Sequence, residues 1–263
     1  MKIKAKKSLG QHWLRDKATL FDVVTAAEIT KDDIVLEVGP GLGALTEILC
    51  ESAKQVIAVE ADSELISPLK VQFYNKPNVE FVEADILTFD LGVLPSKYKV
   101  AANIPYYLTS NLIRILLEAN NPPDVMALLI QKEVAERIIA QPGQMSVLAF
   151  SVQYYAKAQI TRAVGKELFD PPPKVESAIL QIIRRDKPVF SADREKLFKL
   201  VKAGFGEKRK MLRNALAGGL RLETSQVEEL LQKSGLPANA RAQELSLDDW
   251  RQVYNNALAL QII

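Results

Sequence analysis

The chain has 263 residues, of which 48% are apolar and 25% charged, and its formal net charge at pH 7 is +2. These values are close to those of average soluble proteins, so the chain can bury a core. They exclude an intrinsically disordered chain, a collagen-like repeat and a disulfide scaffold.

The numbers of cysteines and histidines and the length of the apolar runs further restrict the class of protein. Cys50 is the single cysteine and cannot form an internal disulfide, which fits a reducing cytoplasm. His12 is the only histidine, so the chain lacks a cysteine and histidine set with metal-ligand spacing, and we expect no structural metal. The longest apolar run, Val125 to Ile130, is too short for a membrane helix, and no export signal is visible. We therefore expect a cytoplasmic protein without a membrane partner.

From Ile34 to about Arg184, short β-branched runs alternate with amphipathic stretches, which is typical of βαβ units and a mainly parallel sheet. A helix over Ala44–Ser52 follows the first strand. The connector before the last strand, Phe169–Pro173, is too rich in proline for regular structure. The expected strands are Ile34–Val38, Gln55–Val59, Val79–Val82, Lys99–Ala102, Asp124–Ile130 and an antiparallel pair, Gln159–Val164 with Ser177–Ile183.

After the polar connector Arg184–Arg194 the pattern changes to helices alone, so we expect a domain boundary between residues 184 and 185. One apolar stripe comprises Leu197, Phe198, Val201 and Phe205, and another comprises Val227, Leu230 and Leu231. Ser246 with Asp249 forms a capping box that opens a last helix through Trp250 and Val253.

Basic residues are concentrated in this helical part. Residues 1–184 hold 20 Lys and Arg against 22 Asp and Glu, whereas residues 185–263 hold 14 against 10. Eight basic residues lie between Arg194 and Arg213, which indicates a phosphate-binding surface. The alternative is a solvated helix face, which is the commoner meaning of a charge run.

A glycine-rich segment, Glu37–Gly43, lies between an expected strand and a helix. Gly39 and Gly41 permit a tight turn and let a ligand approach the backbone. Glu60 follows 21 residues after Gly39, at the next strand end, where its carboxylate can accept from ribose hydroxyls. Together they favour an adenosine-containing cofactor, without separating NAD from S-adenosylmethionine; a structural turn with a surface glutamate is the alternative.

Polar residues also end the next two strands. Asp85 follows the third strand and can accept from an adenine amino group, and Asn103-Ile104-Pro105-Tyr106 follows the fourth. Two acceptors, the Asn103 side-chain oxygen and the Pro105 carbonyl, can hold both hydrogens of an exocyclic amine and aim its lone pair at a methyl donor. Tyr106 offers a flat face for an extruded base. The alternative is an ordinary proline turn.

These motifs together resemble the ribosomal RNA adenine dimethylases, which make N6,N6-dimethyladenosine in small-subunit rRNA from S-adenosylmethionine. The resemblance covers nearly the whole chain. The matching segments are Gln11–Leu14, Glu37–Gly41, Asn103–Tyr106, Phe169 with Pro171, Pro173, Lys174 and Val175, and Arg209–Leu216.

Residue roles follow from the resemblance, position by position. It implies catalysis by Asn103, Pro105 and Tyr106, and stacking of the target base on Tyr106 and Phe169, although a hydrophobic anchor is an equally good interpretation of Phe169. The implied contacts of S-adenosylmethionine are His12, Leu14, Gly39, Gly41, Glu60, Asp85 and Asn103. The RNA-binding residues that we expect are Lys208, Arg209, Lys210 and Arg213.

Three positions depart from the usual family pattern. His12 stands where asparagine is usual, Trp13 replaces phenylalanine, and Tyr107 follows the catalytic aromatic residue where asparagine is frequent. A histidine can donate or accept near the cofactor, so its protonation can make binding depend on pH, and a structural role near the cleft is the alternative. Tyr107 leaves the core motif intact and bears on how the target nucleotide is held.

Three other functions compete with this interpretation. The related methyltransferases that modify large-subunit rRNA and confer antibiotic resistance share the first motif and Asn-Ile-Pro-aromatic, but the segment Arg209–Leu216 resembles the small-subunit enzymes more closely. A ribosome-assembly RNA-binding factor without catalysis would not need an intact Asn103, Pro105 and Tyr106. An NAD-dependent oxidoreductase accounts for Gly39 and Glu60 only.

The sequence therefore predicts an α/β protein of two domains. Residues 1–184 form a Rossmann-like class I S-adenosylmethionine-dependent methyltransferase domain with a mainly parallel seven-stranded sheet and a basic N-terminal arm, and residues 185–263 form a small all-helical domain that recognises RNA or the ribosome. The expected activity is N6,N6-dimethylation of adenosines in small-subunit rRNA during ribosome biogenesis, at two adjacent adenosines in a hairpin near the 3′ end. We expect a monomer that acts on the small subunit or an assembly intermediate, binding phosphates through its tail and its N-terminal lysines.

Overall fold

The computed structural model describes residues 6, 10–207 and 210–263. The chain divides into two compact units. The first comprises the residues up to Glu136 together with Lys157–Arg184, and the second comprises Arg137–Ala156 together with Arg185–Ile263. The chain thus divides after Arg184, where the sequence pattern changes, but the second unit also takes up residues 137–156, which the expectation of a single boundary did not include.

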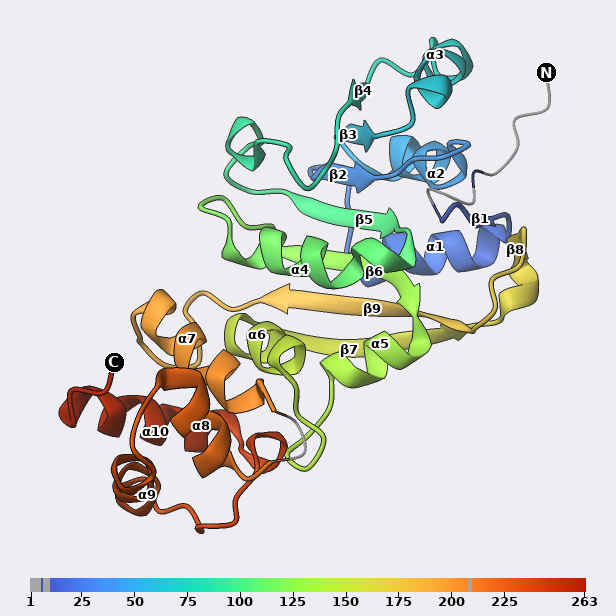
Figure 1. Ribbon diagram of the computed structural model, residues 1–263. Helices are drawn as coiled ribbons and strands as arrows, with labels where there is room; N and C mark the ends of the chain where they lie inside the picture. The colour runs from blue at the N-terminus through green and yellow to red at the C-terminus, as the bar shows by residue number, and fades with distance from the viewer. Residues whose placement is uncertain (1–5, 7–9, 208–209) are drawn as a thin grey trace. The chain divides into compact units, whose positions relative to one another are not determined.

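A seven-stranded sheet forms the centre of the first unit, in the order β4-β3-β2-β5-β6-β9-β7 (Figure 1). Neighbours from β4 to β6 are parallel, and β9 runs antiparallel to β6. This confirms the predicted mainly parallel sheet. The strands are β2 (Ile34–Val38), β3 (Gln55–Glu60), β4 (Val79–Glu83), β5 (Lys99–Asn103), β6 (Val125–Gln131), β7 (Ala156–Val164) and β9 (Ser177–Arg184).

Burial explains why these runs form strands. Val35, Val56 and Val100 are fully buried, as central strands covered on both faces require. β7 is hydrogen-bonded to β9. Gln159 bonds to Gln181, and Thr161 bonds to the carbonyl of Ile179, so the two strands run antiparallel. The helices of this unit include α1 (Lys17–Ala26), α2 (Ala44–Ser52), α3 (Ser63–Gln72), α4 (Thr109–Glu118) and most of α5 (Lys132–Ile138).

The strand order reverses direction between β2 and β5. The chain runs outward from β2 through β3 to β4 and then returns to the other side of β2 with β5. At such a switch point the loops after the two strands separate and leave a crevice beyond their carboxyl ends. The topology therefore places the segments after Val38 and Asn103 beside one crevice.

A second, two-stranded sheet joins β1 (Trp13–Leu14) to β8 (Phe169–Asp170) in antiparallel pairing (Figure 1). The prediction that Phe169–Pro173 has no regular structure is thus wrong for its first two residues. Proline lacks an amide hydrogen, but Phe169 and Asp170 precede the prolines and keep theirs. This pairing brings the N-terminal segment to the loop before β9.

The second unit contains five complete α-helices in the part of the chain that the structure describes. Trp250 is fully buried in its core, where its ring packs against Phe150 and Phe205. Phe150 lies on a helix that the sequence patterns did not indicate, and its aromatic contacts explain why residues 137–156 join this unit. The helices are α6 (Val147–Tyr155), α7 (Arg194–Phe205), α8 (Leu212–Leu220), α9 (Thr224–Lys233) and α10 (Leu247–Ala259).

The expected stripes of both α7 and α9 are buried, and the predicted capping box is present: Ser246 accepts from the Asp249 amide, and Asp249 accepts from the Ser246 amide. No helix among the described residues is long and apolar enough to cross a membrane.

Candidate active site

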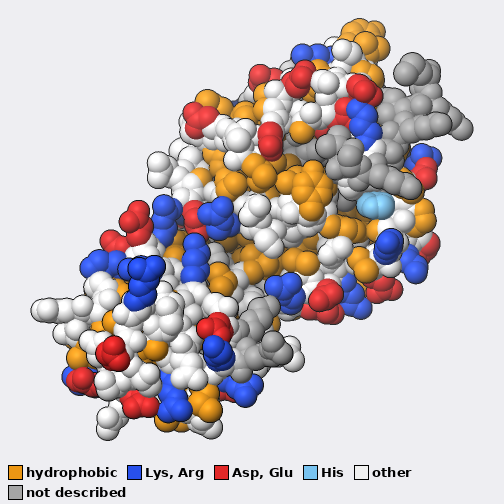
Figure 2. All heavy atoms as spheres, viewed as in Figure 1, with side chains coloured by type: hydrophobic (Ala, Val, Ile, Leu, Met, Phe, Trp, Pro, Cys, Tyr) orange, Lys and Arg blue, Asp and Glu red, His pale blue; other side chains and the backbone are white. Residues whose placement is uncertain are grey.

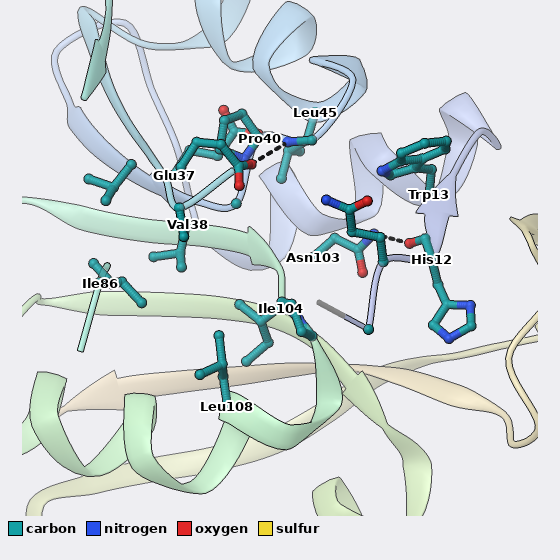
Figure 3. A pocket seen from close by; sticks show the side chains of 18 of the residues that line it. His12, Trp13, Glu37, Val38, Pro40, Leu45, Ile86, Asn103, Ile104 and Leu108 are labelled. Atoms are coloured by element: carbon teal, nitrogen blue, oxygen red, sulfur yellow. Dashed lines mark hydrogen bonds between the residues drawn. The ribbon is translucent and has the colours of Figure 1, made fainter. Parts of the chain in front are cut away.

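A cavity of about 360 Å³ opens at the carboxyl ends of β2, β3 and β5 (Figure 3). All of its lining residues belong to the first unit. The structure thus collects at one place the side chains that the sequence distributes over about 95 residues. The predicted site residues that line it are His12, Leu14, Gly39, Gly41, Glu60, Asp85, Asn103, Pro105 and Tyr106.

The glycine loop after β2 forms one wall of the cavity. Gly39 has a φ of +69°, in the left-handed region that glycine adopts without strain. A Cβ added there would meet no atom within 4 Å from the described residues beyond its two chain neighbours. The space over Gly39 is therefore open cavity that a side chain would fill. Gly41 donates its amide hydrogen to Glu60 Oε2 at 3.1 Å, which fixes the loop to the end of β3.

Glu60 is 7% exposed and lines the cavity. Its Oε1 accepts from the amide of Asp62 at 2.9 Å, and the Ala61 amide is a further backbone donor to the carboxyl group. A carboxylate has about four acceptor sites, so Glu60 can still accept from a hydroxyl group. Burial raises the pKa of Glu60. Asp85 is exposed, and its Oδ1 accepts from the amide of Leu87 at 2.9 Å.

Glu37 is a site residue that the sequence analysis quoted in a motif without assigning a role. It lines the cavity and is 1% exposed, and its Oε2 has no hydrogen-bond partner among the described residues. Burial raises the pKa of Glu37 to about 8, against the opposing effect of Thr46, and the charge of Glu60 adds to the increase. A buried carboxyl with a free oxygen beside a cavity is a group that a bound ligand can satisfy. The sequence feature that could have indicated a role for Glu37 is its position two residues before Gly39.

We predict that Glu37 makes the stability of the ligand-free protein decrease with pH. The carboxyl is protonated in the folded state up to about pH 8 and ionised in the unfolded chain above its ordinary pKa of 4.5. The unfolding free energy should therefore decrease between about pH 4.5 and 8, by up to about 5 kcal/mol at 1.36 kcal/mol per pKa unit. Thermal unfolding from pH 5 to 9 measures this slope.

The variant Glu37→Gln should flatten that slope because it cannot ionise. Glu80→Gln, at an exposed glutamate of β4, is the matched control and should keep the wild-type slope. Parallel pH curves for Glu37→Gln and the wild-type protein would contradict the assignment.

Asn103, the last residue of β5, is oriented by a backbone contact. Its Nδ2 donates to the carbonyl oxygen of His12 at 3.1 Å (Figure 3). A carbonyl only accepts, so the NH₂ group must face His12, and the side-chain oxygen of Asn103 remains available as an acceptor. This contact distinguishes the two ends of the amide and leaves Oδ1 as the end without this partner.

Pro105 and Tyr106 form the start of the 3₁₀ helix η3 (Tyr106–Leu108). The Pro105 carbonyl accepts from the amide of Leu108 at 3.0 Å, which leaves one lone pair for another donor. The Tyr106 hydroxyl bonds to Ser177 Oγ at 2.7 Å, and its ring stacks on the His12 ring with centroids 5.9 Å apart. Tyr106 is therefore positioned by the hydrogen bond of its hydroxyl to Ser177 and by the packing of its ring on His12.

His12 links this group to the loop before β9. Its Nδ1 lies 2.7 Å from the carbonyl oxygen of Pro171, which only accepts, so Nδ1 carries the hydrogen. The loop that contains Phe169 is thus linked through His12 to Tyr106. Sequence reasoning had no signal for this contact, because the two segments are 159 residues apart.

The N-terminal segment is fastened to the start of α3 by Asp62, which the sequence analysis missed. Asp62 caps α3 and accepts from Lys6 Nζ at 2.8 Å and from Gln11 Nε2 at 3.1 Å. Lys6 also pairs with Glu64 at 3.0 Å. Lys6 is thus engaged by acidic groups, whereas we had expected it to contact phosphates; Lys2, Lys4 and Lys7 lie outside the described residues.

Phe169 is placed differently from the expected base-stacking position. It is 4% exposed, belongs to the hydrophobic core with Leu14 and Leu168, and does not line the cavity. This burial corresponds to the hydrophobic-anchor alternative. β8 pairs Phe169 with Leu14, so its ring fixes the N-terminal segment that carries His12.

The predicted RNA-binding residues are partly outside the described residues. Lys208 and Arg209 are not described, whereas Lys210 pairs with Glu207 at 2.6 Å and Arg213 pairs with Glu228 at 3.0 Å. Exposed pairs of this kind contribute little stability, so a phosphate can replace the glutamate.

The neighbouring helix α7 also carries exposed cations. Lys196, Lys199 and Lys202 are exposed there, and Figure 2 shows Lys and Arg side chains gathered beside this helix.

The chain is similar to known proteins over nearly its whole length. The model of a family described as ribosomal RNA adenine dimethylase matches residues 2–258. The ribosomal RNA small subunit methyltransferase A of Dehalococcoides mccartyi (strain CBDB1) is 42% identical over 255 residues, covering 95% of this chain and 88% of that protein. The protein of the same name from Synechocystis sp. (strain PCC 6803) is 38% identical and covers 97% of both chains.

Two solved structures are similar over nearly the whole chain. A dimethyladenosine transferase from Plasmodium falciparum has a TM-score of 0.79 and 27% identity, covering 95% of this chain and 98% of that chain. The 23S rRNA methyltransferase ErmE has a TM-score of 0.73 and 28% identity, covering 93% and 98%. The fold is therefore that of class I methyltransferases.

Proposed function

Because the chain belongs to the ribosomal RNA adenine dimethylase family, we propose that it transfers methyl groups from S-adenosylmethionine to N6 of adenosines in small-subunit rRNA, twice at each adenosine. The observation that carries this proposal is the orientation of Asn103 beside Pro105 and Tyr106 in the cavity. The substrate that we propose is the small subunit or its assembly intermediate in the cytoplasm, with two adjacent adenosines in a hairpin as targets of a monomeric enzyme.

The cavity fits the cofactor that this family implies. The open space over Gly39 accommodates a ligand against the backbone, Glu60 retains acceptor capacity for ribose hydroxyls, and the free oxygen of Glu37 can accept from a ligand donor. Asp85, His12 and Leu14 border the same space. When bound, S-adenosylmethionine supplies an electrophilic methyl group on a sulfonium.

The residues of the chain activate a poor nucleophile by alignment. The lone pair of adenine N6 is delocalised into the ring, and the two amine hydrogens can be accepted by Asn103 Oδ1 and the free lone pair of the Pro105 carbonyl. The base lies against Tyr106, whose ring is held by Ser177. The first transfer replaces one hydrogen by methyl, so the second requires the base to be re-oriented or released and rebound.

Methyl transfer tests the proposal. Labelled S-adenosylmethionine is incubated with undermethylated small subunits, large subunits and free rRNA in parallel, with wild-type protein and Asn103→Ala. We expect labelled N6,N6-dimethyladenosine in small-subunit RNA from the wild-type protein only. Label in large-subunit RNA would replace the proposed substrate, and cofactor binding without transfer to any RNA would favour a non-catalytic assembly factor.

We predict that the basic segment between α7 and α8 sets the salt dependence of RNA binding. Changing Lys208, Arg209 and Lys210 together to Ala removes three cations that can each release a counterion from RNA. The slope of log affinity against log salt should become less negative by about 2, at about 0.7 per phosphate for single strands. Filter binding between 50 and 300 mM salt measures the slope, and an unchanged slope removes this segment from the proposed RNA surface.

A further inference from the structure

Tyr107 is the exposed aromatic residue of the candidate site. Its side chain is 60% exposed, whereas Tyr106, the residue before it, is partly buried. Both residues line the cavity, and none of the described residues hydrogen-bonds to the Tyr107 hydroxyl. The core motif makes no use of this ring, so its exposure at the cavity requires another explanation.

The 3₁₀ helix η3 separates the directions of the two rings. With three residues per turn, consecutive side chains point about 120° apart. Tyr106 reaches Ser177 and His12, and Tyr107 therefore faces away from both. Neighbouring Cα atoms are about 3.8 Å apart, so the two rings extend in different directions from nearly the same point of the cavity wall. A nucleotide next to one held at Tyr106 is thus within reach of Tyr107.

The N-terminal segment supports the Tyr107 ring from one side. A Cβ added to Gly10 would lie 3.5 Å from both Cδ1 and Cε1 of Tyr107 and 3.6 Å from Cβ of Pro105. Gly10 has a φ of +59°, and this close approach places backbone rather than a side chain against the ring. The backbone at Gly10 thus packs against the Tyr107 ring, while most of the residue remains exposed.

We propose that Tyr107 is a second stacking platform, which holds the base adjacent to the target adenosine in the rRNA. This inference rests on the proposed function and adds a substrate-positioning residue outside the catalytic motif. Aromatic rings bind unpaired bases by stacking, and every base has a flat face, so the platform favours purines through their larger stacking area. Figure 2 shows hydrophobic side chains on the surface beside the chain's single histidine, His12, of the same site.

The experiment measures steady-state methylation of undermethylated small subunits by Tyr107→Ala, Tyr107→Phe and wild-type protein. Tyr107→Ala should raise the KM for small subunits by about 5-fold to 150-fold, the range for one base stacked on an aromatic ring. The kcat and the KM for S-adenosylmethionine should change less than twofold, because Tyr107 is not among the residues to which cofactor contacts are assigned. Tyr107→Phe keeps the ring and should resemble the wild-type protein.

A matched control and a change in the substrate separate stacking from a structural role. Tyr74→Ala removes a ring that is 79% exposed and does not line the cavity, so it should have no effect. Small subunits whose rRNA carries either a purine or uridine next to the target are compared, with each neighbour changed separately. The wild-type protein should prefer the purine on one side, and Tyr107→Ala should lose this preference.

An unchanged KM in Tyr107→Ala, or a raised KM with the purine preference intact, would contradict the proposed stacking role of Tyr107. A wild-type protein that methylates no small subunit would instead overturn the proposed function. In that case filter binding of the same subunits still decides the role of Tyr107, because loss of the purine preference in binding supports stacking and its persistence excludes it.

Discussion

Asn103→Ala should lower the kcat for methyl transfer to small-subunit RNA by about 10²-fold to 10³-fold, the size of effect when one preorganised polar group is removed from a reacting centre. The structure explains why alanine cannot replace this side chain. Asn103 Nδ2 is committed to the His12 carbonyl at 3.1 Å, which turns the side-chain oxygen into an acceptor of fixed direction for an amine hydrogen. Steady-state kinetics with saturating cofactor measure the loss.

Two variants distinguish this role from anchoring of the N-terminal segment. His12→Ala keeps the backbone carbonyl that Asn103 binds, so it should lose much less kcat than Asn103→Ala. Asn103→Asp keeps an oxygen but replaces the donor with a second acceptor facing the His12 carbonyl, so it should also be impaired. If Asn103→Ala raised only the KM for S-adenosylmethionine and left kcat unchanged, Asn103 would be a positioning residue for the cofactor.

Gly39→Ala should weaken binding of S-adenosylmethionine by about tenfold to 100-fold, because the added methyl group occupies the open space over the loop. Among the described residues, apart from Gly39 and its two chain neighbours, no atom lies within 4 Å of that Cβ position, so the methyl group would meet the ligand. Overpacking of this kind costs about 1 to 3 kcal/mol. Calorimetric titration of the folded variant with S-adenosylmethionine measures the change.

Gly235→Ala is the matched control for backbone strain. Gly235 has a φ of +71°, nearly equal to the +69° of Gly39, and its Cβ position is also open, but it lies in the second unit. Both variants should lose a similar unfolding free energy, about 1 to 2 kcal/mol for a left-handed alanine. Equal cofactor affinity in the two variants would show that the space over Gly39 is not the cofactor site.

Local patterns were sufficient for the main sheet of the first unit. The run Ile34–Val38 and the helix Ala44–Ser52 have the bounds that their apolar period and flanking glycines predict. Parallel strands connected by helices must place their carboxyl ends at one edge, so Glu60, Asp85 and Asn103 were predictable neighbours from their positions after successive strands. The family resemblance added roles to these residues.

Contacts between distant segments were not predictable from one sequence. Residues 137–156 join the second unit because Phe150 packs on Trp250, 100 residues away, and no local period encodes that choice. Phe169 shows the same limit, since an aromatic residue before prolines fits both a base-stacking role and a core anchor. The tertiary structure determines its 4% exposure and its pairing with Leu14.

The sequence by itself determined the class of fold, the strand-end residues of the cavity and the family, because these depend on short periodic patterns and on motifs of fixed spacing. Only the tertiary structure decided which groups those residues contact. Asn103 is oriented by the backbone of His12, Lys6 is held by Asp62, and Tyr107 is exposed beside Gly10. Direction, burial and pairing depend on neighbours brought together by folding, and they fix which atoms of each residue remain free for chemistry.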